Sequence, residues 1–282
     1  MSPEGQTQQM VIAREQLTTL HRELKLSEAQ LIELVGGEKR KAKRLIMSAI
    51  LACADTPKLR QCTSKSVVRA VLQAAIVGLD LVNGEGWIVP YKDTATFMPG
   101  YRGYKRKAAE AGYLLYASVV RIGDQFSYQA VPLVLTHTPD IDANGAIRAA
   151  YATAGHSSHH PDQRLVGAQV ISAAELEKAK KLSKGRDGSS PSPAWKEWPE
   201  RMALKLVIRR LCQDLDLREG SMRDLIRVDE QADRGGVDVD LDDVEDITPT
   251  IEDPLTDGPH RFGFAPVAAV DSSELVRKDG QI

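Results

Sequence analysis

The spacing of apolar residues changes twice along the chain, and these changes limit the folds that it can adopt. Helical spacing occupies the first part of the chain, in residues 10–24, 27–35, 38–53 and 64–77. Residues 86–171 then show mostly short apolar runs between turn residues, which favour strands. Helical spacing returns from Ser172 onward. We therefore expect an α+β fold, with a small, mostly antiparallel sheet flanked by N-terminal and C-terminal helices.

Two basic helices are expected beside the strands. A hairpin over residues 86–100 leads into a basic helix over residues 101–111, and a second basic helix is expected over residues 195–211. Between them, Ser172 and Glu175 have the spacing of a capping box, in which each side chain accepts a hydrogen bond from the backbone N–H of the other residue.

Charge is divided unevenly along the chain. Residues 1–228 carry 33 Lys and Arg against 24 Asp and Glu, whereas residues 229–282 carry 4 against 15. The second segment is also nearly free of aromatic residues and lacks sustained periodicity, which is typical of disorder. We therefore expect a disordered N-terminus over residues 1–9, a folded core over residues 10–228 and a flexible acidic tail. A basic core attracts polyanions, and the tail repels them or competes with them.

Several classes of protein are disfavoured by the sequence. It contains no apolar run long enough to cross a membrane and lacks the start of a signal peptide. Its 3 cysteines show no CxxC spacing, which fits a reducing cytosol better than a disulfide framework or a zinc site. The glycine loops that bind nucleotides and the nucleophile elbow are absent, so we expect no enzyme activity and no cofactor.

The best cluster of candidate metal ligands lies in residues 156–162 and contains His156, His159, His160 and Asp162. We interpret this segment as a solvated loop, because metal sites favour regular ligand spacing on rigid elements. A nuclease-type metal site, built from acidic residues that folding brings together, stays open as an alternative.

Positive charge gathers in three segments, which are residues 39–44, residues 101–107 and the set Arg201, Lys205, Arg209 and Arg210. The spacing of four residues places Arg201, Lys205 and Arg209 on one helix face, where they can follow a phosphate backbone. Near the second segment, cations alternate with aromatic residues of the kind that stack on bases: Tyr91, Phe97, Tyr101 and Tyr104. The alternative is that these aromatic residues belong to the core and the cations only solvate a surface.

Four stretches of the chain resemble a known family. Residues 86–112, GWIVPYKDTATFMPGYRGYKRKAAEAG, resemble its hairpin followed by a basic helix. Further matching stretches follow in order: GDQFSYQ and THTPDIDANGAIRAAYATA in residues 123–154, VISAAELEKAKKLSKG in residues 170–185, and AWKEWPERMALKLVIRRL in residues 194–211. Over roughly residues 40–228 the chain is thus similar to the RecT-type single-strand annealing proteins. Ile171 stands where that family usually has Met, and Leu206 where it usually has Thr.

The resemblance implies that the protein binds single-stranded DNA and anneals complementary strands without ATP in homologous recombination, as rings or helical filaments. DNA contacts carry over to the matched positions Lys92, Tyr101, Arg102, Lys105, Arg106, Lys205, Arg209 and Arg210. Gly100 and Gly103 would permit a close approach of the backbone. Trp195, Trp198 and Met202 are expected to pack the last helix on the sheet, and His137 to anchor a strand end.

The resemblance also implies a location in the cytoplasm of a bacterial host. The acidic tail would bind a partner such as a host single-strand binding protein or a companion 5′-to-3′ exonuclease, or would only limit non-specific binding. The alternative function is that of a passive single-stranded nucleic-acid-binding protein without annealing activity.

Overall fold

The computed structural model describes five stretches of the chain, which are residues 3–142, 145–156, 165–183, 190–215 and 221–233. The chain divides into a unit of residues 1–238 and a unit of residues 239–282, and all the described residues belong to the first. The acidic segment after residue 233 therefore lies outside the described residues, as does most of the histidine-containing segment, at 157–164.

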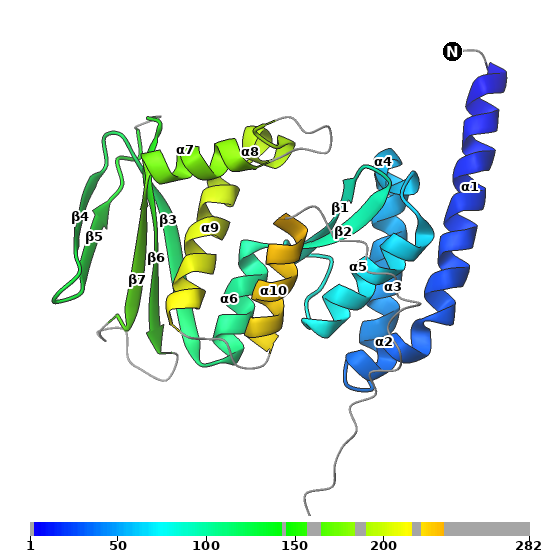
Figure 1. Ribbon diagram of the computed structural model, residues 1–282, viewed down its shortest axis with the longest axis horizontal. Helices are drawn as coiled ribbons and strands as arrows, with labels where there is room; N and C mark the ends of the chain where they lie inside the picture. The colour runs from blue at the N-terminus through cyan, green and yellow to red at the C-terminus, as the bar shows by residue number, and fades with distance from the viewer. Residues whose placement is uncertain (1–2, 143–144, 157–164, 184–189, 216–220, 234–282) are drawn as a thin grey trace, which may run out of the picture. The chain divides into compact units, whose positions relative to one another are not determined.

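Helices form the N-terminal part of the described chain: α1 (Pro3–Leu26), α2 (Glu28–Leu34), α3 (Lys39–Asp55), α4 (Pro57–Arg60) and α5 (Ser64–Ile76) (Figure 1). As the sequence predicts, α2 ends before Gly36 and α5 before Gly78, both of which have a positive φ. Helix α1 begins at Pro3, upstream of Met10, where the sequence predicts the start of helical spacing. Proline suits this position, because the N–H that it lacks has no partner in the first turn.

A hairpin and a basic helix follow. Strand β1 (Gly86–Tyr91) pairs antiparallel with β2 (Thr94–Pro99), and α6 (Tyr101–Glu110) begins after a single further residue. Strand β2 packs against α5 and against the last described helix, α10 (Ser221–Asp233). This hairpin is therefore held between the N-terminal helices and the C-terminal end of the described chain.

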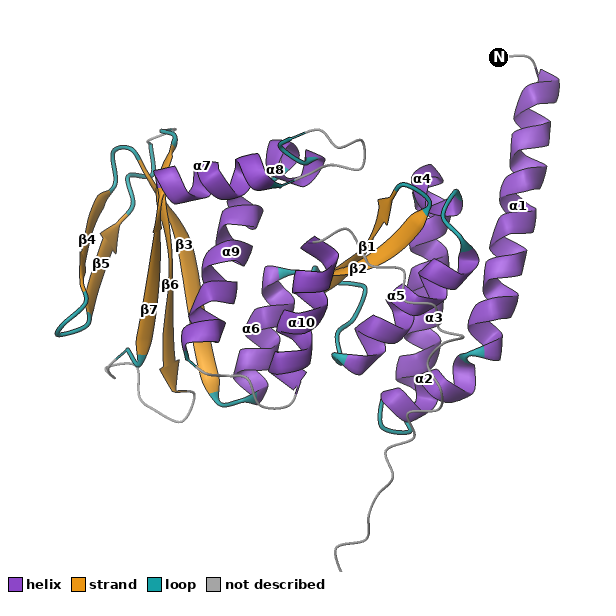
Figure 2. Cartoon of the chain, viewed as in Figure 1, coloured by secondary structure: helices purple, strands orange, loops and turns teal. Residues whose placement is uncertain are grey.

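The other strands form two further antiparallel sheets (Figure 2). The larger has the order β3–β6–β7, with β3 (Tyr113–Arg121), β6 (Ile147–His156) and β7 (Gly167–Ser172). The smaller is a hairpin of β4 (Gln125–Gln129) and β5 (Val134–Thr138). Helix α9 (Pro199–Asp214) packs on all three strands of the larger sheet, on the side away from the β4–β5 hairpin (Figure 1). The α+β class is confirmed, although the strands form three small sheets rather than one.

The second predicted basic helix is divided in the structure. The capping box of Ser172 and Glu175 starts α7 (Ala173–Leu182) as predicted, but α8 (Pro193–Glu197) and α9 replace the single helix expected over residues 195–211. Between them Trp198 has φ −133° and ψ 52°, because a proline at position 199 disfavours helical geometry in the residue before it.

A cluster of buried apolar side chains runs through these elements, from Leu20 of α1 to Val228 of α10. Helix α10 buries four apolar residues, Met222, Leu225, Val228 and Ala232. The folded core thus reaches at least Asp233, five residues beyond the boundary predicted from charge. Among the described helices, none is both long enough and apolar enough to span a membrane.

Candidate nucleic-acid interface

Glycine residues hold the start of α6 against the loop that precedes β1. A Cβ atom at Gly100 would lie 2.3 Å from the carbonyl oxygen of Gly84, and one at Gly103 would lie 2.5 Å from that of Glu85. Both distances are too short for a side chain, so both positions require glycine. The close backbone approach predicted at these glycines is therefore an approach to the chain's own loop, residues 83–85, which fixes the loop beside the cations of α6.

Three of the predicted contact residues in this region are cations without a salt bridge to any described residue. Lys92 lies exposed at the tip of the β1–β2 hairpin, where its φ is 55°. Arg102 is exposed, and its guanidinium donates hydrogen bonds to the carbonyl oxygen of Asn83 at 3.0 Å and to the hydroxyl of Tyr101 at 3.4 Å. The Nζ atom of Lys105 lies 5.5 Å from the ring centroid of Tyr116. These three cations are available to phosphate groups.

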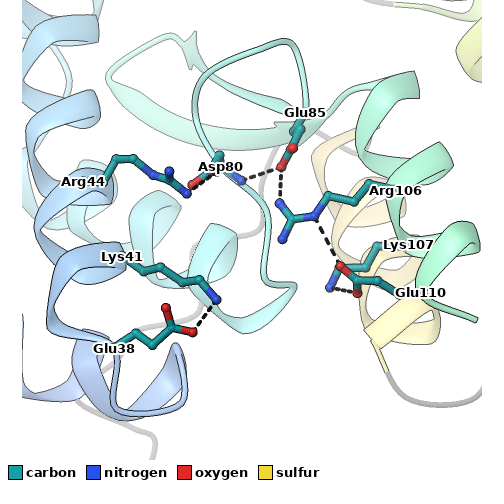
Figure 3. Close-up of polar contacts among 8 residues, drawn as sticks. All are labelled: Glu38, Lys41, Arg44, Asp80, Glu85, Arg106, Lys107 and Glu110. Carbon is teal, nitrogen blue, oxygen red and sulfur yellow. Dashed lines mark hydrogen bonds and ion pairs between the residues drawn. The ribbon is translucent and has the colours of Figure 1, made fainter.

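The next cations of α6 are neutralised by carboxylates (Figure 3). Arg106 forms ion pairs with Glu85 at 2.6 Å and with Glu110 at 3.2 Å, while the buried Lys107 pairs with Glu110 at 2.7 Å. Partial burial lowers the pKa of Arg106, but Glu85, Glu110 and Asp80 together outweigh this effect and raise the pKa above its ordinary value. The predicted contact residue Arg106 is thus already paired within the chain.

Helix α3 faces α6 across the loop that joins α5 to β1, residues 77–85. Figure 3 shows Arg44 of α3 and Arg106 of α6 pointing toward one another, with Asp80 and Glu85 between them. Arg44 forms an ion pair with Asp80 at 2.5 Å, and the backbone N–H of Asp80 donates to Glu85 at 3.0 Å. The remaining cations of this helix face solvent without a salt bridge to described residues, apart from Lys41: they are Lys39, Arg40 and Lys43. Cations of both helices therefore flank one acidic loop.

Of the predicted row of cations on α9, Arg201 is exposed, but Lys205 and Arg209 do not lie open to solvent. Lys205 is buried, and its Nζ atom lies 2.5 Å from a carboxylate oxygen of Asp229, which is 0% exposed. Arg209 contacts Asp229 at 3.3 Å and also pairs with Asp233. Tyr104 of α6 donates its hydroxyl proton to Asp229 at 2.8 Å. Lys205 and Arg209 therefore bind Asp229 and Asp233 of α10, which the charge pattern had assigned to the tail.

This buried cluster changes the protonation of its members. Burial, reinforced by the charge of Asp229, raises the pKa of Tyr104 well above its ordinary value. For Arg209, burial lowers the pKa, but Asp229 and Asp233 raise it by more. Both groups therefore keep their protons at neutral pH, and the cluster holds α6, α9 and α10 together.

Arg210, the last predicted contact on α9, forms an ion pair with Glu175 at 2.8 Å. This contact and hydrogen bonds from the backbone N–H and the hydroxyl of Ser172 lower the pKa of Glu175 to about 2. Arg210 is thus connected to the capping box that starts α7.

The aromatic residues predicted to stack on bases are mostly buried. Phe97 and Tyr104 are 0% exposed, and Tyr101 is packed against the core. Burial raises the pKa of Tyr91 to about 12. The interpretation of these residues as part of the core, which the sequence left open, therefore holds for Phe97 and Tyr104.

The residues that the sequence predicts to have structural roles differ in their burial and contacts. Trp195 is buried as predicted, but Trp198 is 51% exposed, with the guanidinium of Arg201 at 4.3 Å from its ring centroid. His137 does anchor a strand: its ring nitrogens lie 3.1 Å from Asp124 and 3.2 Å from the hydroxyl of Tyr151. It thereby ties the β4–β5 hairpin to β6.

The carboxylate partners are the residues that sequence reasoning missed. Glu110 was detectable, because it lies three and four residues after Lys107 and Arg106 on one helix. The partners of α9 are contributed by α7 and α10, and single-sequence spacing carries no signal for such contacts. Within the described residues, no group of three or more acidic, histidine or cysteine side chains is placed to hold a metal ion.

Comparison with known proteins agrees with the earlier resemblance. The model of the RecT family matches residues 43–238, which is more than half of the chain. Protein RecT of Escherichia coli (strain K12) is 28% identical over 183 residues, which make up 60% of this chain and 65% of that protein. The chain thus spans a little under two thirds of the length of this relative. The matched region includes the β1–β2 hairpin and helices α6, α9 and α10. The chain belongs to the RecT family.

Proposed function

We propose that the protein binds single-stranded DNA and anneals complementary strands without ATP, in homologous recombination. The observation that carries this proposal is the family match over residues 43–238, which contains all the predicted DNA contacts. The cations Lys92, Arg102 and Lys105, which have no salt bridge to a described residue, support it, because such Lys and Arg side chains supply the phosphate contacts on which single-strand binding depends.

Annealing on such a surface follows from physical chemistry. Phosphate contacts hold one strand and screen its charge, while its bases stay accessible to a second strand. Each matched step then contributes about 1.4 kcal/mol of stacking free energy, so pairing proceeds without nucleotide hydrolysis. The protein acts by lowering phosphate repulsion and by ordering the first strand. This role requires no catalytic residue and no cofactor.

We further propose that the protein acts as a ring or helical filament in the cytoplasm of a bacterial host. Residues 234–282, which carry an excess of acidic residues, would bind a host single-strand binding protein or a companion 5′-to-3′ exonuclease. Helices α1 to α5 would contribute subunit contacts.

Strand-pairing kinetics test the annealing proposal. Two complementary oligonucleotides, one with a donor and one with an acceptor dye, are mixed with the purified protein without ATP. We expect faster pairing than in buffer alone. A passive binder would slow pairing instead, because it shields the bases of both strands, and that result would overturn the proposal.

The nuclease alternative has its own measurement. A labelled oligonucleotide is incubated with the protein and Mg²⁺ or Mn²⁺, and its length is followed on a denaturing gel. Intact DNA agrees with the annealing proposal, whereas metal-dependent cleavage would replace it.

A further inference from the structure

Trp87 is an exposed aromatic residue within the candidate nucleic-acid interface. It lies on β1 opposite Met98, and 42% of its surface is exposed, whereas the next residue, Ile88, is buried. Among the other aromatic residues near α6, Phe97 and Tyr104 are fully buried and Tyr101 packs against the core. Tyr116 of β3 is more exposed than Trp87, but Lys105 of α6 lies over its ring.

Two glycines hold the Trp87 indole in place. A Cβ atom at Gly100 would lie 2.5 Å from its Cζ3 atom, and one at Gly84 would lie 3.5 Å from its Cζ2 atom. The six-membered ring therefore fills the space that the missing side chains leave, directly over the backbone. A side chain held in this way loses little conformational entropy when a ligand covers its exposed part.

Arg102 lies beside this indole. Its Cδ atom would be 3.4 Å from a Cβ atom at Gly84, so the arginine and Trp87 flank the same glycine. The hydrogen bond from Nη1 of Arg102 to the carbonyl oxygen of Asn83 orients the guanidinium. Arginine has five N–H donors, and those on Nη2 have no partner among the described residues. A fixed aromatic ring and a fixed cation with spare donors thus stand next to each other.

We propose that Trp87 and Arg102 form a binding subsite for one nucleotide of single-stranded DNA. The exposed part of the Trp87 indole stacks on a nucleobase, and Arg102 binds a phosphate of the same strand segment. Duplex DNA cannot use the stacking half of this subsite, because both faces of its internal bases are already covered. Trp87 is therefore a residue that distinguishes single strands from duplexes, while Arg102 contributes to the binding of both.

This inference rests on the proposed single-strand binding, and one set of titrations tests the two separately. Fluorescence anisotropy is measured for the full chain and its variants with three probes, which are an oligo-dT, an abasic oligonucleotide of the same length and a duplex. We expect Trp87→Ala to weaken oligo-dT binding about tenfold, since one stacked base contributes about 1–3 kcal/mol and 1.4 kcal/mol is tenfold. Its affinity for the abasic and duplex probes should stay within about twofold, because phosphate contacts carry them.

Two further variants complete the test. Trp87→Phe keeps an aromatic face in a smaller ring, so it should recover part of the lost affinity and should fold if Trp87→Ala does not. Trp198→Ala removes an exposed tryptophan that lies outside the proposed subsite and has Arg201 over its ring, and this variant should bind oligo-dT like the unsubstituted protein. The decrease of tryptophan emission on oligo-dT binding should be smaller in Trp87→Phe than in the unsubstituted protein.

Different outcomes of these titrations would contradict the Trp87 subsite and the proposed single-strand binding. Equal losses on oligo-dT and on the abasic probe, no loss at all, or an equal loss in Trp198→Ala would each overturn the stacking role of Trp87. If the unsubstituted protein binds none of the single-stranded probes, the proposed function itself fails. Binding by the unsubstituted protein together with an unaffected Trp87→Ala removes the subsite alone.

Discussion

The region of β1, β2 and α6 differs from helix α9 in how it presents its predicted DNA contacts. In the first region three of the four predicted cations have no salt bridge to a described residue, and only Arg106 is paired. On α9 all three predicted cations face carboxylates of α7 or α10. The two regions look alike in sequence, because both combine clustered cations with aromatic residues and family motifs.

Clusters of cations that look alike in the sequence can therefore be of two kinds in the folded protein, which are exposed cations without a carboxylate partner and buried cations with one. An exposed cation without a partner adds to the long-range field and is available to phosphate. A buried cation with a carboxylate adds nothing to binding directly, but its removal leaves an uncompensated charge in the core. Substitutions on α9 should therefore act through stability, and those at Lys92, Arg102 and Lys105 through binding.

The largest effect is expected from Asp229→Asn. This change leaves the buried Lys205 and the largely buried Arg209 without their shared carboxylate, so the free energy of unfolding should fall by about 3–5 kcal/mol. Urea denaturation followed by circular dichroism measures it. Asp233→Asn is the matched control, because Asp233 is exposed, and it should cost less than about 1 kcal/mol. Equal losses in the two variants would remove the distinction between a buried cluster and a surface pair.

Replacing Lys92, Arg102 and Lys105 by Gln should give the opposite result. Stability should change by less than about 0.5 kcal/mol per substitution, since these side chains are on the surface. The slope of log affinity for oligo-dT against log salt should flatten by about 2, at about 0.7 for each lost phosphate contact. Salt-dependent anisotropy titrations measure this slope. The control replaces three exposed lysines elsewhere, Lys178, Lys181 and Lys196, with the same change in net charge; a similar flattening there would show that location is irrelevant.

Glu85→Gln should convert a paired cation into an available one. Without the carboxylate, Arg106 keeps only its pair with Glu110, and one negative charge leaves the loop beside α6. We expect oligo-dT to bind up to about fivefold more tightly, corresponding to the energy of one partly exposed ion pair. Anisotropy titration at low salt is the measurement, and Glu177→Gln on α7, which frees Lys180, is the control. Weaker binding by Glu85→Gln would mean that the loop needs this carboxylate for its shape.

The smallest expected effect is a decrease in the stabilisation by Glu175 at acidic pH. The pKa of Glu175 in the folded protein is about 2, below its ordinary value of about 4.3, so its ionised form stabilises the fold. That stabilisation is present in full above the ordinary pKa and is lost as the pH falls toward 2. The difference in melting temperature between the unsubstituted protein and Glu175→Gln should therefore shrink between pH 5 and pH 2 by the principle of proton linkage. A constant difference would show that Arg210 and Ser172 do not depend on the carboxylate charge.

Local features of the fold were predictable because local chemistry determines them. The β1–β2 hairpin lies within the expected residues 86–100, and the Ser172–Glu175 capping box is present as its spacing indicates. Pro199 is also a sequence signal for a break, although the pattern of apolar and basic residues predicts one helix over residues 195–211. The missing information lies in contacts between distant segments. Nothing near Lys205 in the sequence indicates Asp229, and the alternation around β1 does not distinguish the exposed Trp87 from the buried Phe97.

The contacts of Asp229 also limit which substitutions the cluster can accept during evolution. Tyr104, Lys205 and Arg209 each contact the same carboxylate from two different helices. A substitution at Asp229 removes the partner that these three side chains share, and only Arg209 keeps another carboxylate, that of Asp233. We therefore expect a change at Asp229 to be accompanied by changes at the other three sites. Descendants of this sequence should either keep all four or exchange them together for apolar residues of similar volume, since such a replacement also satisfies the core.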